Sequence, residues 1–232
     1  MLNIIEEYAL VCKVNPLQAQ KETKTIIPGQ KINVNGYGYV DLKIPSGMLW
    51  ASCNVGADKP SDYGLYFQWG YTVGYTKEQI GNGGGQKKFA PDCSDYKWGA
   101  NQNFTKYTTS SATLELEDDA SHVNMGGDWH MPSPDQIKEL FDNTTNTWTT
   151  QDGVSGRLFT SKNDGSKSIF IPAAGNAWGG SVQGSGYGGS VWSSMLGVGN
   201  VIGGQNLYFG SGNVGLGFSY RYFGLSVRGV IG

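Results

Sequence analysis

The sequence predicts an α+β fold built from short strands, two helices and long glycine-rich loops. The chain has 232 residues, of which 36 are glycine, roughly double the average usage of about 7%. Glycine adopts positive φ at little cost, so tight turns and loops should outnumber long helices. Short apolar runs bounded by Gly or Asn recur along the chain, and only two stretches have the spacing of a helix.

The first 38 residues differ from the rest of the chain. A short apolar stretch and a polar connector precede an alternating segment centred on Asn35-Gly36, a dipeptide typical of a β-hairpin. Residues 1–38 are either an attachment or assembly segment or extra strands of the main domain, which we expect over 39–232. Within that domain, residues 70–104 are polar and glycine-rich and indicate a long surface loop.

The first expected helix covers residues 115–124. Leu114, Leu116 and Val123 would form its apolar face, and its acidic start suits the positive end of a helix dipole.

The second expected helix has the clearer start. Residues 133–136, Ser-Pro-Asp-Gln, form a capping box with proline at the first helical position. Ile137, Leu140 and Phe141 then share one face. Short strands follow, each bounded by Gly or Asn, at residues 156–162, 167–175, 190–196, 205–211 and 225–230.

Charge and terminal sequence exclude several function classes. The formal net charge of -2 gives no field that would attract nucleic acid or an anionic membrane. The N-terminus has no basic region typical of a signal peptide, and no apolar run approaches the ~20 residues of a membrane span. We therefore expect a protein made in the cytoplasm and not inserted in a membrane.

The cysteines and histidines indicate neither a structural metal nor catalysis. The cysteines are three and widely spaced, at Cys12, Cys53 and Cys93, which argues against a disulfide framework and against a four-ligand zinc site. We expect all three to be reduced and buried. His122 and His130 are the only histidines, and no serine lies in a nucleophile-elbow motif.

The only candidate metal cluster is weak. Asp118, Asp119 and His122 could ligate a cation, but a solvated, capped helix start explains them better. Residues 171–232 contain no Asp, Glu or Lys, so a calcium site is not expected there. The sequence thus predicts no enzyme, no metal and no cofactor.

The C-terminal segment has an unusual composition. Residues 175–224 include 16 Gly, 7 Ser, 4 Tyr and 4 Asn, and nine aromatic residues lie between Trp178 and Phe223. Antibody binding loops use this mixture, in which Tyr gives rigid contact area and Ser, Gly and Asn give adaptable hydrogen bonding. Apolar strands interrupt the glycines, so the segment is not a low-complexity tail.

Six sequence blocks in order carry a resemblance to a known family. They are YVDLKIPSGMLWASCNVGA (39–57), DYGLYFQWG (62–70), EDDASHVNMGGDWHMPS (117–133), IPAAG (171–175), VWSS (191–194) and RYFGLSVRGV (221–230). Together they resemble the variable proteins of diversity-generating retroelements from gut bacteria and their phages, and the related bacterial major paralogous surface domains. The resemblance covers about residues 39–230.

The resemblance implies a C-type-lectin-like fold, related to formylglycine-generating enzymes, with a variable region over about 175–225. In that family a reverse transcriptase copies a template repeat with errors at adenines, so Asn codons of the AAY type are rewritten. The matching variable, ligand-binding positions are Tyr187, Gly188, Gly197, Gly199, Ile202, Gly203, Tyr208, Gly210, Gly215, Gly217, Phe218, Ser219, Tyr220, Tyr222 and Phe223. Each of these residue types is reachable from AAY, whereas Gln183, Met195 and Gln205 are not and belong to the scaffold.

The implied framework is built on Trp192, Leu207, Val227 and Arg228. We expect Arg228 and Arg221 to be structural, with Arg228 donating hydrogen bonds to carbonyls. Many of the presumed contact positions are glycine, so binding is expected to depend on the aromatic members of the set, which are Tyr187, Tyr208, Phe218, Tyr220, Tyr222 and Phe223.

The resemblance implies a receptor-recognition protein, carried in a phage tail, whose hypervariable surface binds a protein or other surface ligand on a host cell. Two alternatives remain: a bacterial surface adhesin-type domain, and a structural virion protein with no ligand. Residues 1–38 are the candidate contact for a second copy or a virion partner.

Overall fold

The Asn35-Gly36 turn starts the first sheet of the protein, whose computed structural model describes residues 33–81, 87–92 and 96–232. Both turn residues have positive φ, 52° and 81°, as a two-residue hairpin requires. The turn joins β1 (Asn33–Val34) to β2 (Tyr37–Asp41), which confirms the predicted hairpin. Residues 33–38 are therefore strands of the main sheet, and residues 1–32 lie outside the described part of the chain.

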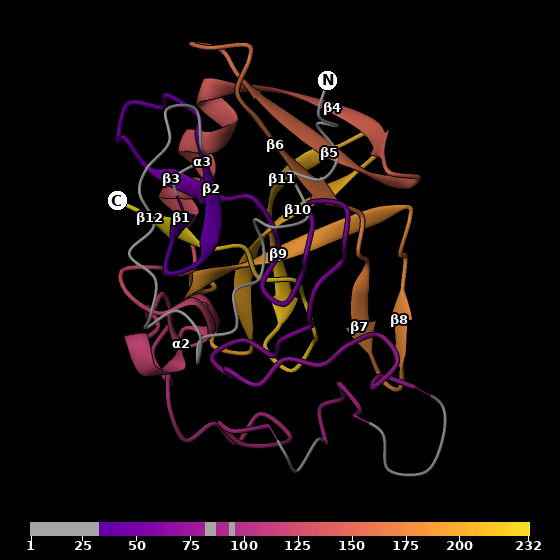
Figure 1. Ribbon diagram of the computed structural model, residues 1–232. Helices are drawn as coiled ribbons and strands as arrows, with labels where there is room; N and C mark the ends of the chain where they lie inside the picture. Colours follow the sequence, from indigo (N-terminus) through magenta and orange to yellow (C-terminus); the bar gives the residue numbers. More distant parts are fainter. Residues whose placement is uncertain (1–32, 82–86, 93–95) are drawn as a thin grey trace.

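Two further strands complete this sheet in the order β1-β2-β3-β12. They are β3 (Leu49–Ala51) and β12 (Val230–Ile231), and Val230 pairs with Trp50. The pairing places the C-terminal strand β12 beside β3, which lies early in the described chain (Figure 1).

The second helix agrees with the prediction, and so do the last two of the three strands that follow it, whereas the first of these strands was not predicted. Helix α3 (Pro134–Asn143) begins at Ser133 with both bonds of the capping box present. Ile137 and Leu140 are fully buried, and Phe141 stacks on Phe159 with ring centroids 6.3 Å apart. The antiparallel strands β4 (Thr144–Gln151), β5 (Val154–Ser161) and β6 (Ser168–Pro172) follow directly.

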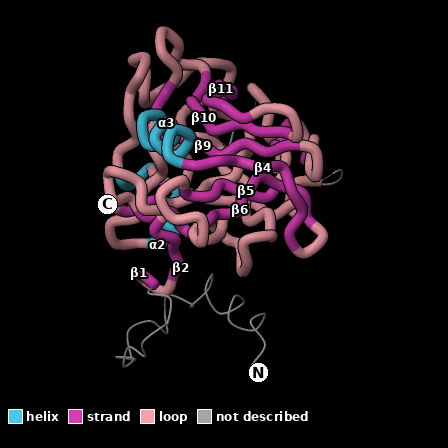
Figure 2. The backbone as a smooth tube through the Cα atoms, turned by 90° about the horizontal axis from the view of Figure 1, so that it is seen from above, coloured by secondary structure: helices cyan, strands magenta, loops and turns pink. Residues whose placement is uncertain are grey.

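The C-terminal segment forms two more antiparallel sheets. A short hairpin pairs β7 (Asn176–Trp178) with β8 (Ser181–Gln183). The strands β9 (Gly188–Leu196), β10 (Gly203–Gly210) and β11 (Val214–Tyr220) form a sheet in the order β11-β10-β9. Figure 2 shows these three strands side by side with β11 outermost. Small antiparallel sheets with two α-helices place the described chain in an α+β or mostly-β class.

The first predicted helix is wrong in its extent and in its apolar face. A 3-10 turn, η1 (Leu116–Asp118), and a separate helix, α2 (Ala120–Met125), replace it. Asp119 has an extended backbone between them and caps α2. Residues before and after Asp119 therefore do not share one helical face. Leu116 and Val123 are consequently exposed, and Leu114 alone of the predicted face is buried.

The last predicted strand, 225–230, is also shorter than expected. Leu225 forms an isolated β-bridge with Phe67, and Ser226 forms one with Val191. Successive residues of this stretch therefore pair with different segments and do not form a continuous strand with one partner. Only Val230 and Ile231 belong to a regular strand.

One apolar core joins three of the sheets. It combines Ile137 and Leu140 of α3 with residues of β3, β5, β6, β9, β10 and β12, and a second cluster surrounds the buried Trp69, Trp129 and Trp192. The predicted framework residues Trp192, Leu207, Val227 and Arg228 are all fully buried, which confirms their structural position.

Arg228 connects three segments of this core. Its guanidinium donates to Asn54 Oδ1 at 3.0 Å, to the Ala51 carbonyl at 2.8 Å and to the Phe170 carbonyl at 3.0 Å. The predicted carbonyl bonds are therefore confirmed. Burial lowers the pKa of Arg228 to about 9, so the side chain remains charged at neutral pH.

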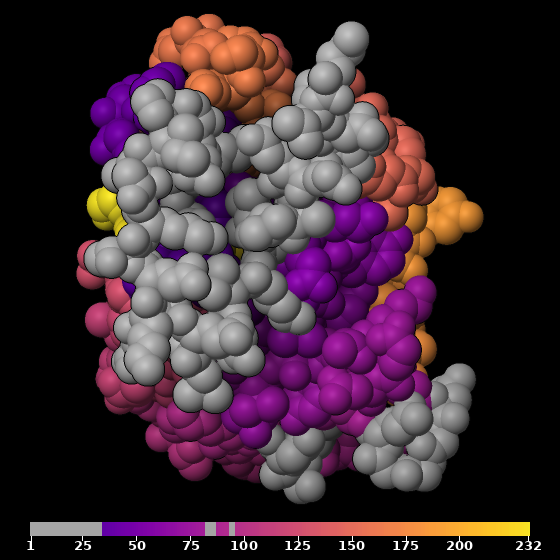
Figure 3. Space-filling view, viewed as in Figure 1, coloured from indigo at the N-terminus to yellow at the C-terminus, as the bar shows by residue number. Residues whose placement is uncertain are grey.

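The described parts of the 70–104 segment are irregular, as predicted, but not wholly superficial. Figures 1 and 3 show this segment along the lower edge of the molecule. Ile80, Phe89 and Tyr96 are buried, and Phe89 exchanges two backbone hydrogen bonds with Gly179. The segment therefore packs against β7 and helps to position it.

Cys53 corrects the prediction that the cysteines are reduced. It is buried, but it is disulfide-bonded, and its partner is not among the described residues. An odd cysteine count therefore does not exclude a disulfide. Among the described helices, none is long and apolar enough to cross a membrane.

A candidate ligand-binding surface

Five aromatic side chains form a continuous cluster on the surface of the C-terminal segment. We call Trp178, Phe218, Tyr220, Tyr222 and Phe223 the aromatic cluster. Tyr220 stacks on Tyr222 with centroids 5.3 Å apart and planes 6° from parallel. Phe223 contacts both tyrosines edge-on, at 5.6 and 5.4 Å, and the rings of Phe218 and Trp178 extend the cluster at 6.3 and 6.1 Å. Trp178, Phe218 and Tyr220 are 40–47% exposed.

Local backbone geometry explains why these rings meet. Phe218 and Tyr220 are two residues apart on β11, so their side chains lie on the same face of the strand. The chain turns immediately after β11, where Phe223 N donates to the Tyr220 carbonyl at 2.8 Å. Trp178 reaches the cluster because Ala177 and Gly224 exchange two backbone hydrogen bonds of 2.7 and 2.9 Å.

Arg221 fixes the turn from beneath the cluster. It is fully buried, and its Nε donates to the Tyr96 hydroxyl at 2.8 Å while its terminal nitrogens donate to the carbonyls of Tyr107 and Lys106, both at 3.1 Å. The guanidinium also lies 4.1 Å from the ring centroid of Phe104, a cation–π contact. The predicted structural role of Arg221 is confirmed by this burial.

Burial raises the pKa of Tyr96, although Arg221 opposes that shift. The Tyr96 hydroxyl also donates to the Trp69 carbonyl at 2.8 Å. It therefore stays a neutral donor and acceptor between Arg221 and the buried tryptophan.

A second polar link holds the backbone of Tyr222. Gln68 Nε2 donates to the Tyr222 carbonyl at 3.2 Å, and Lys87 Nζ donates to Gln68 Oε1 at 3.0 Å. The Lys87 ammonium lies 5.0 Å from the Tyr75 ring centroid and 5.3 Å from that of Phe89. The orientation of Tyr222 is thus set by residues of the 62–92 region.

Two predicted variable glycines make room for Phe218. A Cβ at Gly197 would lie 2.7 Å from the Phe218 ring, and a Cβ at Gly203 would overlap both that ring and the Ser219 carbonyl oxygen. Any side chain at Gly203 would therefore force the strand or the ring to move. Gly199 and Ile202 lie in the same β9–β10 connection, and Gly199 has open space around it but a φ of +69°.

Tyr208 lies on the other face of the sheet. It pairs with Gly215 in the β10–β11 register, and a Cβ at Gly217 would lie 2.7 Å from its ring. Gly215, Gly217 and Ser219 alternate with Phe218 and Tyr220 along β11, so they face away from the cluster.

Tyr187 lies at the far end of the sheet. It is 84% exposed beside the pair formed by Gly188 and Gly210. Gly210 lies seven positions along β10 from Gly203, the partner of Tyr220, a span of about 23 Å. Of the six aromatic residues on which binding was predicted to depend, the structure brings together only Phe218, Tyr220, Tyr222 and Phe223.

The sequence analysis missed Trp178 as a member of this surface. Tryptophan is not reachable from an AAY codon, so the resemblance gave no reason to include it. A signal was present in the sequence, because Trp178 is the first of the nine aromatic residues in the glycine-rich segment.

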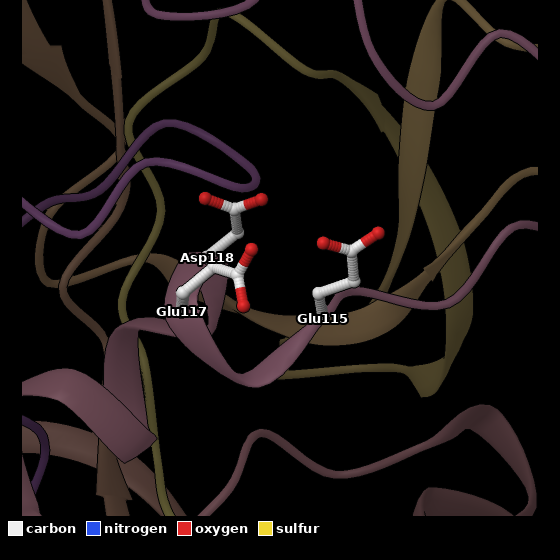
Figure 4. Close-up of side chains that lie close together, drawn as sticks. All are labelled: Glu115, Glu117 and Asp118. Atoms are coloured by element: carbon white, nitrogen blue, oxygen red, sulfur yellow. The ribbon is translucent and has the colours of Figure 1, made fainter.

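An acidic cluster lies on η1 and the residue before it. Carboxylate oxygens of Glu115, Glu117 and Asp118 come within 4.8 Å of one another, and Figure 4 shows them directed to one region. The Lys106 ammonium occupies that region, 2.5 Å from Glu115 and 2.7 Å from Asp118, and Lys97 binds the second Asp118 oxygen at 2.6 Å. A metal ion would have to displace Lys106, so this is an ion-pair network.

Burial alone would raise the pKa of Asp118, but hydrogen bonds from Lys106, Lys97 and Tyr107 outweigh it and lower the pKa below 3.8. Burial together with the bond to Asp118 raises the pKa of Tyr107 to about 12. The network therefore holds Asp118 ionised and Tyr107 protonated.

The predicted alternative metal set of Asp118, Asp119 and His122 is not a cluster. Asp119 accepts from the backbone nitrogens of His122 at 3.0 Å and Met131 at 2.8 Å, and His122 Nδ1 lies 3.2 Å from the Trp129 carbonyl. Asp119 is a helix cap, as expected, but Asp118 and Asp119 are both buried, so the expectation of a solvated helix start is wrong.

A scan against protein-family models, a search of curated proteins and a search of solved structures each gave no match to this chain.

Proposed function

We propose that this protein is a ligand-binding, receptor-recognition protein of the retroelement-diversified type, carried on a C-type-lectin-like domain and serving in a phage tail. The observation that carries the proposal is the aromatic cluster, five contacting rings, three of them exposed, on a segment without Asp, Glu or Lys. Exposed aromatic groups that contact one another are unusual unless a partner covers them.

The chemistry of the cluster suits recognition. Tyr and Trp supply rigid contact area with few rotatable bonds, and they dominate the energetics of protein interfaces. Arg221 and Gln68 hold the 220–223 turn through its backbone and its buried side chain. Little conformational entropy would then be lost when a ligand binds.

The absence of carboxylates from residues 171–232 favours direct contact through rings, hydroxyls and backbone groups over a metal-bridged contact. The proposed ligand is a protein or other molecule on the surface of a host cell. The six sequence blocks support the assignment to diversity-generating retroelements, and the short sheets with two helices are compatible with the proposed lectin-like class.

Binding to intact cells tests the recognition role. Fluorescently labelled protein is incubated with a panel of gut-bacterial strains, and bound fluorescence is compared with that of the Phe218→Ala/Tyr220→Ala/Tyr222→Ala/Phe223→Ala variant. We expect the variant to lose binding to every strain that the native protein stains. The matched control is Leu116→Ala/Val123→Ala, which removes two side chains of similar exposure, 56% and 50%, away from the cluster. A folded quadruple variant that still binds would refute the assignment.

Genomic sequence tests diversification separately. We expect a reverse-transcriptase gene near this one and a template repeat that matches the codons of about residues 175–225 and differs mainly at adenines. A genome with neither would leave a binding surface that is not diversified by a retroelement.

A further inference from the structure

The outer edge of β11 has a row of backbone groups beside which the described part of the chain places no strand. Gly210 N donates to the Asn213 carbonyl and Arg221 N to the Ile202 carbonyl, which fixes the residues that face β10. Hydrogen-bonded residues alternate along an antiparallel strand. The backbone groups of Asn213, Gly215, Gly217 and Ser219 therefore face β10, and those of Val214, Leu216, Phe218 and Tyr220 point outward.

None of the described residues bonds to those outward groups, apart from Phe223 N, which donates to the Tyr220 carbonyl. Figure 2 shows β11 as the outermost strand of its sheet. Natural edge strands are normally protected by charges, proline or a bulge. The strand VGLGFSY has no charge and no proline, and its register with β10 is regular throughout.

We propose that two copies of this chain pair through β11, antiparallel about a two-fold axis at Gly217, to form a continuous six-stranded sheet. This register is the one that pairs all four outward residues. Leu216 lies opposite Phe218 of the second copy, and Val214 lies opposite its Tyr220. A shift of the axis to Leu216 or Phe218 leaves outward groups without partners.

The side chains of β11 are self-complementary in this register. Each large apolar residue meets another large apolar residue, aliphatic against aromatic, and such cross-strand pairs stabilise a sheet by about 0.2–1 kcal/mol each. On the opposite face, Gly215 meets Ser219 and Gly217 meets itself, so nothing bulky separates the backbones. Leu216, Phe218 and Tyr220 are 40%, 46% and 40% exposed in the single copy. The net charge of -2 gives little repulsion between copies.

The pairing would make the proposed receptor bivalent. A two-fold axis perpendicular to the sheet keeps the same face of both copies on one side, so both aromatic clusters point the same way. The two Tyr220 residues would be about 20 Å apart along the strands. A bivalent surface gains avidity for repeated ligands without any new contact.

Charge reversal tests the dimer with the full chain. Sedimentation of the native protein from micromolar to near-millimolar concentration should show its mass doubling. Leu216→Lys/Phe218→Lys places four ammonium groups face to face in the proposed register, and Leu216→Glu/Phe218→Glu places four carboxylates there. We expect each variant alone to be monomeric and an equimolar mixture of the two to restore the dimer.

The mixture also serves as the folding control, because variants that fail to fold cannot re-form the dimer. The charge control is Leu116→Lys/Val123→Lys, which should dimerise like the native protein. A native protein that stays monomeric overturns the proposal, and so does a dimer that persists in either β11 variant. A monomeric native protein that still stains cells would leave the proposed function intact, since the aromatic cluster lies within one copy.

Discussion

The aromatic cluster and the buried layer beneath it meet in four consecutive residues, 220–223. Within 220–223, Tyr220, Tyr222 and Phe223 contact one another, Tyr220 is exposed and Phe223 also packs against the core, whereas Arg221 is fully buried. The Arg221 guanidinium donates hydrogen bonds to Tyr96, Tyr107 and Lys106, whereas the aromatic side chains contact mainly one another. The backbone of this turn is therefore fixed by the buried contacts of Arg221, so the exposed Tyr220 side chain can change at little cost to the fold.

The largest expected effect comes from the buried layer. Arg221→Met removes the donor of the Tyr107 and Lys106 carbonyls and of the Tyr96 hydroxyl. Buried acceptors left without a donor cost about 1–3 kcal/mol each, partly offset by removal of a buried charge, so we expect the free energy of unfolding to fall by about 3 kcal/mol. Urea denaturation measures it. The control is Lys138→Met, whose side chain is on the exposed face of α3, and it should change stability by less than about 0.5 kcal/mol. An equal loss of unfolding free energy in the two variants would contradict the structural role of Arg221.

Two glycines of the C-terminal segment should differ in how well they tolerate a side chain. Gly203→Ser would place an atom against the Ser219 carbonyl and the Phe218 ring, whereas a Cβ at Gly212 would meet nothing within 4 Å. Overpacking costs about 1–3 kcal/mol, so we expect Gly203→Ser to lower the free energy of unfolding by about 2 kcal/mol and Gly212→Ser to leave it unchanged. Tolerance of serine at Gly203 would show that this glycine is a freely replaceable surface position.

Asp118→Asn should have a smaller effect, and one that depends on pH. The folded pKa of Asp118 lies below its ordinary 3.8, so its stabilising contribution is present above pH 3.8 and is lost as the pH falls through the folded value. We expect the variant to lose about 1–2 kcal/mol at neutral pH and to show a shallower decline in acid. Urea midpoints across the acid range measure both. Asp142→Asn, on an exposed ion pair with Lys138, is the control, and identical acid profiles for the two would contradict the assignment.

The smallest effect on stability should come from the outer layer. Trp178 is 47% exposed, so Trp178→Ala should change the free energy of unfolding by less than about 0.5 kcal/mol. The affinity of the labelled protein for the cells that the native protein binds should nevertheless fall about tenfold, because exposed Trp residues are frequent interface hot spots. Unchanged cell binding would mean that the ligand-contacting surface ends at Phe223.

Much of the framework could be predicted because its signals are local. The Ser133 capping box specifies α3, and Asn35-Gly36 specifies a hairpin, since each depends on residues that are close in sequence. The burial of Trp192 and Leu207 follows from apolar residues in the predicted strands. Where a pattern depended on a distant partner, the prediction was wrong: Asp119 interrupts the first helix because it also binds Met131 N.

The surface was harder to predict because its members come from separate elements. Trp178 joins the cluster through the Ala177–Gly224 pairing, which no local pattern indicates. Tyr208 and Phe218 look equivalent in sequence, but the β10–β11 register places them on opposite faces. The disulfide of Cys53 likewise depends on a partner elsewhere in the fold.

The contact of Phe218 with Gly197 and Gly203 has a consequence for a diversified set of such chains. The three positions share one volume, because a side chain at either glycine would occupy the space of the ring. Substitutions there would show strong epistasis: a larger residue at Gly197 would be acceptable only with a smaller one at Phe218. The repertoire of folded sequences would then be smaller than the product of the choices at each site, and recovered variants should covary at these positions.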